Sequence, residues 1–300
     1  MALLTRTLPP ARDLPRARRS RLGGRGGVIP TIVLVLGALY CVLPVSWIAI
    51  ASTKTPGELF STFSFSPSFS GGFAENIQAL FAYNDGVFVR WTLNTLLFAG
   101  VGALVSVFVS AAAGYALAKY RFRGRETIFK LILAGVLIPQ IALAIPQYLL
   151  LSNLNMTGTY WSVLLPSLIN PFSIYLCRIF AAGSVPTEIL EAGRIDGAGE
   201  YRLFWSVGLR LMLPGLITVF LLQFVAIWNN FMLPYIMLSK EGMFPLTVGL
   251  FSLLNRGAGA ASLYTLVITG SLVSIVPLII LFLVLQRYWR LDVLSGGLKG

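Results

Sequence analysis

The stretch that decides the fold runs from residue 131 to residue 177 and reads LILAGVLIPQIALAIPQYLLLSNLNMTGTYWSVLLPSLINPFSIYLC. It contains no charged side chain, and it is more than twice as long as the roughly 20 residues that one helix needs to cross a membrane core. Its middle, SNLNMTGT at residues 152–159, is rich in turn-forming residues. The run therefore predicts two membrane-spanning helices joined by a tight turn.

Four further charge-free runs lie on either side, at residues 28–51, 91–118, 211–239 and 257–286. They are continuously apolar rather than alternating, which favours helices over a membrane barrel. With 56% hydrophobic and 11% charged residues, the chain has too much apolar surface for a soluble domain. We predict an all-α polytopic membrane protein with six spans, near residues 28–50, 93–119, 129–151, 160–179, 211–235 and 263–286.

The basic residues report the orientation of these spans. If the N-terminus is inside, only four of the 23 lysines and arginines fall in outer segments, namely Lys54, Arg90, Lys240 and Arg256. Cytoplasmic loops carry an excess of basic residues, so both termini are expected in the cytoplasm. The net charge of +12 is thus a consequence of topology, and no nucleic-acid partner is predicted.

The arginine-rich residues 1–27 resemble the start of a signal peptide, but the apolar stretch after them is too long for one. We expect a disordered tail leading into a retained first span, followed by a transmembrane domain over residues 28–300. Cys41 and Cys177 lie within apolar runs, and the chain has no histidine. No disulfide, metal site, cofactor or catalytic residue is predicted.

Charges return between the fourth and fifth spans, where residues 185–206 form a helix–turn–helix-like unit. Pro186 suits the first position of a helix, where its missing N–H group is not needed. Glu188 and Glu191 favour the positive end of that helix. Ala192 and Gly193 have almost no side chain, so another surface could approach the backbone closely.

The same unit carries a predicted stop and a return to the membrane. Asp196-Gly197 is expected to end the helix, with Gly197 as the left-handed residue. A second amphipathic piece with Tyr201, Phe204 and Trp205 follows. A short helix offered to a groove is a common mode of recognition, so we predict that a soluble protein binds here from the cytoplasm.

Residues 186–198, PTEILEAGRIDGA, resemble the EAA loop of ABC-importer permeases. That pattern is E-A-A, three residues, G, nine residues, then I-x-L-P. Two departures are visible. Gly193 replaces the second alanine, and Arg210 stands where the proline is expected, with Pro214 four residues later. The return to the membrane is therefore expected to differ in detail.

Other motifs narrow the resemblance to carbohydrate-uptake permeases, and in particular to the second permease of maltose-type importers. The similarity covers about residues 28–300. Its motifs are AGYALA (113–118), FRGR (122–125), IP (138–139), IPQY (145–148), FVAIWNNFMLP (224–234), FPLTVGL (244–250), QRY (286–288) and GGLKG (296–300).

The resemblance implies a sugar importer in the bacterial cell membrane. This chain would form the path with a second permease, two ATPase subunits would dock under the loops, and an external binding protein would deliver the sugar. It implies an ATPase-coupling set of Glu188, Glu191, Ala192, Gly193, Asp196, Gly197 and Ala198. The tail residues Lys299 and Gly300 would also reach the ATPases. The chain lacks a G-x-x-x-x-G-K-[ST] motif, so ATP would be bound by another subunit.

Rival functions remain open on the sequence. An importer for another small polar solute would share these motifs. An ion-coupled secondary transporter usually needs ionisable groups at membrane depth, and a membrane enzyme needs an acid–base pair or metal cluster there; the predicted spans offer neither. Composition does not exclude a purely structural membrane subunit, and only the cytoplasmic loop at residues 185–206 argues against that role.

Polar residues within or near the spans are candidates for a hydrophilic path. Trp228, Asn229 and Asn230 are the preferred set, because an indole face and carboxamides can contact a sugar. The alternative is that Trp228 marks the membrane boundary and the amides bond neighbouring helices. The other candidates are Asn94, Gln140, Gln147, Asn170 and Gln223.

Overall fold

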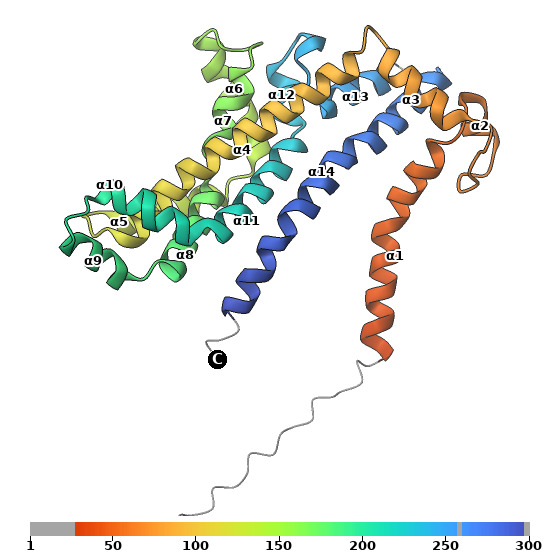
Figure 1. The fold of residues 1–300 in the computed structure, drawn as a ribbon. Helices are drawn as coiled ribbons and strands as arrows, with labels where there is room; N and C mark the ends of the chain where they lie inside the picture. The colour runs from red at the N-terminus through yellow and green to blue at the C-terminus, as the bar shows by residue number, and fades with distance from the viewer. Residues whose placement is uncertain (1–27, 257–259, 297–300) are drawn as a thin grey trace, which may run out of the picture. The chain divides into compact units, whose positions relative to one another are not determined.

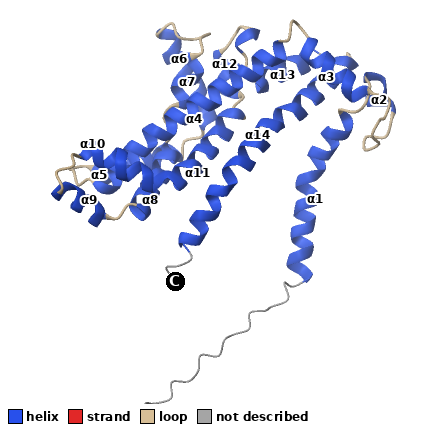
Figure 2. Ribbon diagram, viewed as in Figure 1, coloured by secondary structure: helices blue, strands red, loops and turns tan. Residues whose placement is uncertain are grey.

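The chain folds into helices joined by turns, and its described residues contain no strand (Figure 2). The computed structural model describes residues 28–256 and 260–296, with side chains to residue 288. In chain order the helices are α1 (Val28–Ala51), α2 (Pro56–Ser61), α3 (Gly72–Ala82), α4 (Val87–Lys119), α5 (Arg125–Val136), the 3-10 turn η1 (Gln140–Leu143), α6 (Ala144–Asn153), α7 (Trp161–Ser167), α8 (Pro171–Ser184), α9 (Thr187–Ile195), α10 (Glu200–Leu203), the π turn η2 (Phe204–Gly208), α11 (Leu209–Trp228), α12 (Met232–Met237), the 3-10 turn η3 (Glu241–Met243), α13 (Leu246–Arg256) and α14 (Ala261–Gly296).

The described residues divide at Val45/Ser46 into two separate compact units. In the first unit, the described residues 28–45 form most of α1, an apolar helix without a charged side chain. The last turn of α1 belongs to the second unit, where Ala51 is buried. All other helices lie in the second unit.

The predicted spans are confirmed as helices, but the third span is bent and the fifth has different bounds. Among the described residues five helical stretches are long and apolar enough to cross a membrane: Val28–Ala51, Val87–Lys119, Trp161–Ser184, Glu200–Trp228 and Ala261–Tyr288. The predicted tight turn at residues 152–159 is also present. Asn155 and Gly158 there have positive φ angles of 55° and 71°, which reverse the chain between α6 and α7.

The predicted third span is not one straight helix. Arg125–Val136 and Gln140–Asn153 meet at an angle of 96°, with Pro139 in the break. Proline has no N–H group and disfavours a helical conformation in the residue before it, which accounts for the bend. The fifth span begins and ends earlier than predicted: it covers Glu200–Trp228, and the residues after it form the separate helix α12.

Helix α4 runs the length of the second unit and packs against α8 and α11 (Figure 1). Its N-terminal half lies in one apolar cluster, around Trp91 and Phe98, and its C-terminal half lies in another, around Ala111 and Tyr115. The core is therefore divided into two layers along the axis of α4.

The loops gather at the two ends of α4 as the charge pattern predicts. At one end the Gly158 N–H donates to the Met237 carbonyl (2.8 Å), and the Asn94 amide donates to the Phe244 carbonyl (3.0 Å). At the other end the Lys119 ammonium donates to the Val185 carbonyl. Segments predicted outside thus contact one another, as do segments predicted inside.

Candidate functional site

Helix α9 is anchored in the apolar core by one side chain. Pro186 caps it in an extended conformation (φ −65°, ψ 137°), so the helix begins at Thr187, one residue later than predicted. Leu190 is buried in the same cluster as Tyr115, Cys177 and Met212. Helix α9 therefore shares a packed core with α4, α8 and α11.

The predicted stop at Gly197 is confirmed in detail. The Ala198 N–H donates to the Gly193 carbonyl (2.9 Å) and the Gly197 N–H to the Arg194 carbonyl (3.0 Å). Gly197 has a φ of +79°. This pair of bonds around a left-handed glycine is the Schellman motif, which satisfies carbonyls that the end of a helix leaves free.

Gly193 allows α10 to pack against α9. A Cβ atom at this glycine would lie 2.6 Å from Cδ2 of Leu203. Leu203 is buried and belongs to the same core cluster as Leu190. The glycine in place of the family's second alanine thus leaves room for this leucine, a reason that the sequence did not reveal.

The outward surface of α9 combines acidic, small and apolar residues. Of the predicted coupling set, Gly193 and Ala198 are half-buried and pack inward, and the others are exposed: Glu188, Glu191, Ala192, Asp196 and Gly197. Two apolar side chains that the sequence reasoning missed join this surface, since Ile189 is exposed and Ile195 is 87% exposed. The sequence could have indicated them, because both isoleucines lie on the short charged helix that was predicted to bind a partner.

An ion pair joins the two helices at the α9–α10 turn. Arg194 and Glu200 form an ion pair with Nε–Oε1 at 2.6 Å, and the bond to Glu200 raises the pKa of Arg194. Nearby, burial first and then the charges of Tyr115 and Glu200 raise the pKa of Tyr120 to about 12. The Tyr120 phenol therefore stays neutral at physiological pH.

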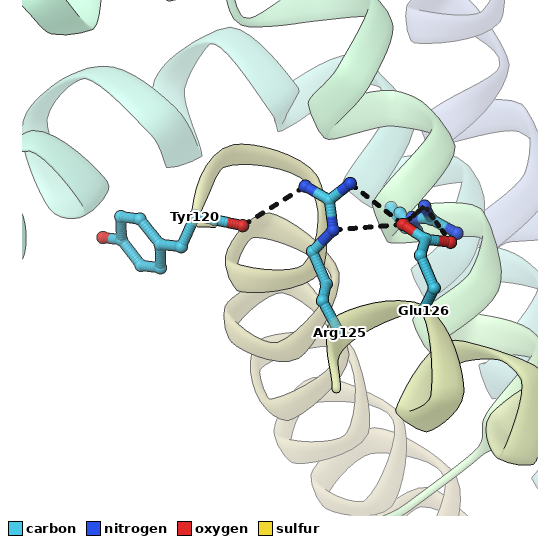
Figure 3. A network of polar contacts seen from close by, with 4 residues as sticks. Tyr120, Arg125 and Glu126 are labelled. Atoms are coloured by element: carbon cyan, nitrogen blue, oxygen red, sulfur yellow. Dashed lines mark hydrogen bonds and ion pairs between the residues drawn. The ribbon is translucent and has the colours of Figure 1, made fainter. Parts of the chain in front are cut away.

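The basic turn between α4 and α5 is tied to α8 (Figure 3). Arg125 donates to the Tyr120 carbonyl (3.3 Å) and contacts the Glu126 carboxylate at 2.9 Å. Arg178 of α8 also reaches Glu126 (3.2 Å), and its guanidinium lies 3.5 Å from the centroid of the Phe129 ring. These contacts join the start of α5 to the end of α4 and to α8.

The return to the membrane is one continuous helical stretch. Residues Glu200–Trp228 qualify as a single candidate span, with a π turn at Phe204–Gly208. Arg210, which replaces the expected proline, keeps its N–H group and stands exposed inside this stretch. A Cβ atom at Gly208 would lie 2.7 Å from the Tyr115 ring, so the π turn packs directly on α4.

Two of the candidate path residues join separate segments of the chain, and a third caps its own helix. Asn94 donates to the Gly242 and Phe244 carbonyls and accepts from the Tyr160 hydroxyl (3.0 Å). Gln223 donates to the Ser167 carbonyl (3.3 Å), and Asn170 caps α8. Asn94 and Gln223 thus show the structural alternative, bonds between distant segments, whereas the Asn170 bond is local to α8.

The preferred set lies beside a cavity of about 340 Å³. Asn229 is exposed and donates to the Val225 carbonyl of its own helix, while Trp228 is buried and stacks on Phe224. Asn230 is half-buried and accepts from the Leu233 N–H at 3.4 Å. Trp228 and Asn229 line the cavity, Asn230 does not, and further lining residues include Thr247, Ser271 and Ser274.

The remaining predictions concern the two ends of the chain and metal binding. Lys299, Gly300 and residues 1–27 lie outside the described residues. Within the described part of the chain, no group of three or more His, Cys, Asp or Glu side chains is placed to hold a metal ion.

Comparison with known proteins identifies the class of this membrane protein. Residues 106–290 match the family described as the inner membrane component of binding-protein-dependent transport systems. The chain belongs to this family. The match covers more than half of the chain and includes α9, its anchor Leu190 and the continuous return helix.

Relatives of this transport component are proteins of similar length. The arabinooligosaccharides transport system permease protein AraQ of Halalkalibacterium halodurans is 34% identical over 273 residues, covering 90% of this chain and 95% of AraQ. The lactose transport system permease protein LacG of Rhizobium radiobacter is 27% identical, covering 87% of this chain and 92% of LacG.

A solved structure shares the fold of this transport component. It is a chain of a bacterial ABC transporter involved in the import of the acidic polysaccharide alginate, with a TM-score of 0.76 and 27% sequence identity. The match covers 87% of this chain and 95% of that chain. The protein is therefore a multi-pass inner membrane component with the ABC-importer permease fold.

Proposed function

We propose that this chain is one of two permeases of an ATP-driven importer for an oligosaccharide or disaccharide. The names of AraQ and LacG support the substrate class. The family description supports the association with a binding protein. A second permease and two ATPase subunits would complete the complex, with Lys299 and Gly300 reaching toward the ATPases.

The observation that carries the coupling proposal is the division of α9 into two faces. Leu190 anchors one face in the core of the spans, and Glu188, Glu191 and Ala192 stand exposed on the other. A groove on an ATPase subunit that closes on the exposed face would pull on the packed core directly. This is how ATP hydrolysis would move the spans.

Two substitutions test the coupling site in the assembled importer. Gly197→Asp places a Cβ atom at a φ of +79°, where side chains are strained. Glu191→Lys reverses a charge on the exposed face. We expect both variants to reach the membrane and to lose the ATPase activity that the binding protein stimulates.

Gly199→Asp is the matched control for Gly197→Asp. Gly199 has a φ of −69°, nothing lies within 4 Å of its Cβ position, and it caps α10, where aspartate is favoured. It should keep stimulated ATPase activity. Normal stimulation in Gly197→Asp and Glu191→Lys would contradict the coupling role.

The cavity beside Trp228 is the second part of the proposal, as a candidate contact for sugar. Its hydroxyls donate to backbone carbonyls: Thr247 to Asn230 (2.9 Å), Ser271 to Val267 (2.7 Å) and Ser274 to Ser271 (2.7 Å). Each oxygen therefore retains acceptor capacity for a hydroxyl of a ligand. The alternative is an importer for another small polar solute. It can be tested by measuring uptake of a labelled sugar in the presence of unlabelled small polar solutes: an oligosaccharide or disaccharide importer should be inhibited by sugars and not by the other solutes.

A further inference from the structure

The first outer connection contains an uncharged segment rich in phenylalanine. Residues 59–74 read LFSTFSFSPSFSGGFA and include five phenylalanines. All five are exposed, and the largest exposed fractions are 92% for Phe69, 74% for Phe63 and 66% for Phe60. We call residues 59–74 the phenylalanine loop. Exposed apolar groups gathered on one segment mark a site of interaction.

The phenylalanine loop has a fixed backbone. The buried Lys54 donates from Nζ to the Phe63 carbonyl (2.7 Å), and the Ser68 N–H donates to the Thr53 hydroxyl (2.9 Å). The Asn76 amide donates to the Ser52 and Lys54 carbonyls at 3.0 and 2.8 Å. The rings are therefore presented by a structured loop.

Two membrane spans place this loop at the membrane boundary. It follows closely on Ala51, the last residue of α1. Phe60 packs edge-on against Tyr264, in the first turn of α14, with ring centroids 5.7 Å apart. The loop thus lies where α1 ends and α14 begins, which is the outer side according to the distribution of basic residues.

We propose that the phenylalanine loop inserts its rings into the outer leaflet, at the boundary between headgroups and acyl chains. Its ring contact with Tyr264 places it beside the first turn of the span α14. Segments that lie in the membrane interface bury phenylalanine and leucine at this depth, and residues 59–74 carry no charged side chain that insertion would desolvate. The alternating serines can stay among the headgroups while the rings enter the apolar layer. The inference depends on membrane location and is independent of the transported solute.

Spin labels can test this in the assembled importer, reconstituted in vesicles of phosphatidylcholine and phosphatidylglycerol. In a Cys41→Ser, Cys177→Ala background, single cysteines would replace Phe63 and Phe69. Their matched controls are Ser64→Cys and Ser70→Cys, one residue away and also exposed. Relaxation by oxygen, which concentrates in lipid, is compared with relaxation by a water-soluble nickel chelate.

We expect labels at Phe63 and Phe69 to be relaxed by oxygen and protected from nickel, and labels at Ser64 and Ser70 to be more accessible to nickel. Protection from both reagents would show that the second permease covers the loop. Nickel access at all four positions, lost only when the binding protein is added, would show docking of that protein. Either result would overturn the lipid assignment.

Discussion

Arg194 and Glu200 join the end of α9 to the start of α10 through two hydrogen bonds, Nε to Oε1 at 2.6 Å and Nη2 to Oε2 at 3.2 Å. A planar guanidinium that meets a carboxylate at two points fixes orientation as well as distance. The turn that contains Gly197 therefore has a defined geometry on both sides, by the Schellman motif and by this ion pair.

Reversing one charge of this pair should weaken coupling, and reversing both should restore it. Arg194→Glu places two carboxylates together, Glu200→Arg places two guanidinium groups together, and the double variant restores attraction. The side chains are 37% and 48% exposed, so solvent screens the pair and its effect on stability should be small. Stimulated ATPase activity is the measurement. A double variant no better than the singles would contradict an orienting role.

Gly193→Ala and Leu203→Val should show non-additive effects on stability. The added methyl group would lie against Leu203, so the leucine must move, whereas valine removes one methylene, worth about 0.8 kcal/mol of burial. We expect each single variant to lower the thermal unfolding temperature in detergent. The double variant should lose less than the sum, because valine makes room for alanine. Simple additivity would mean that the contact is absent.

Tyr115→Phe should leave stability unchanged or raise it. The Tyr115 hydroxyl is buried and has no hydrogen-bond partner among the described residues. An unsatisfied buried polar group costs about 1–3 kcal/mol, and phenylalanine removes it while keeping the ring packed on Gly208. Tyr115→Ala, the control, should destabilise by about 3–5 kcal/mol by opening a cavity. A lower unfolding temperature for Tyr115→Phe would reveal a partner for the hydroxyl.

Asn229→Ala should raise the half-saturation constant of sugar uptake or lower its maximal rate, while assembly and basal ATPase activity persist. The Asn229 amide makes only a local bond to Val225 in the structure and faces the cavity. Asn94→Ala is the contrasting variant, because it removes bonds between α4 and the 240–245 segment and should impair assembly. Unchanged uptake in an Asn229→Ala, Asn230→Ala double variant would assign the sugar contacts to the partner permease.

The orientation of the spans can be tested with an impermeant thiol reagent in a variant that lacks both native cysteines. A cysteine at Asn153, exposed at the end of α6, should react from outside, and one at the exposed Arg123 should not. Asn153 is preferable to Asn155, whose φ of 55° would strain a cysteine. The opposite labelling pattern would reverse the topology.

Local features of the sequence determined the spans and the stop at Gly197, and they predict the sidedness of the spans. Long uncharged runs require lipid, basic residues are retained on one side, and a glycine after a short helix supplies a conformation that other residues avoid. These signals depend on neighbours in the chain. These features could therefore be predicted without knowing which helices pack against one another.

Only the tertiary structure decided which polar residues serve packing and why Gly193 is a glycine. Asn94 bonds residues of the 242–244 segment, and the space beside Gly193 is taken by Leu203 from the next helix. The sequence also did not predict the bend at Pro139 or the end of the fifth span at Trp228. Proline occurs in both straight and broken membrane helices, so its presence alone does not predict a break. Contacts between distant segments depend on how helices pack, and the pattern of any single helix does not specify its neighbours.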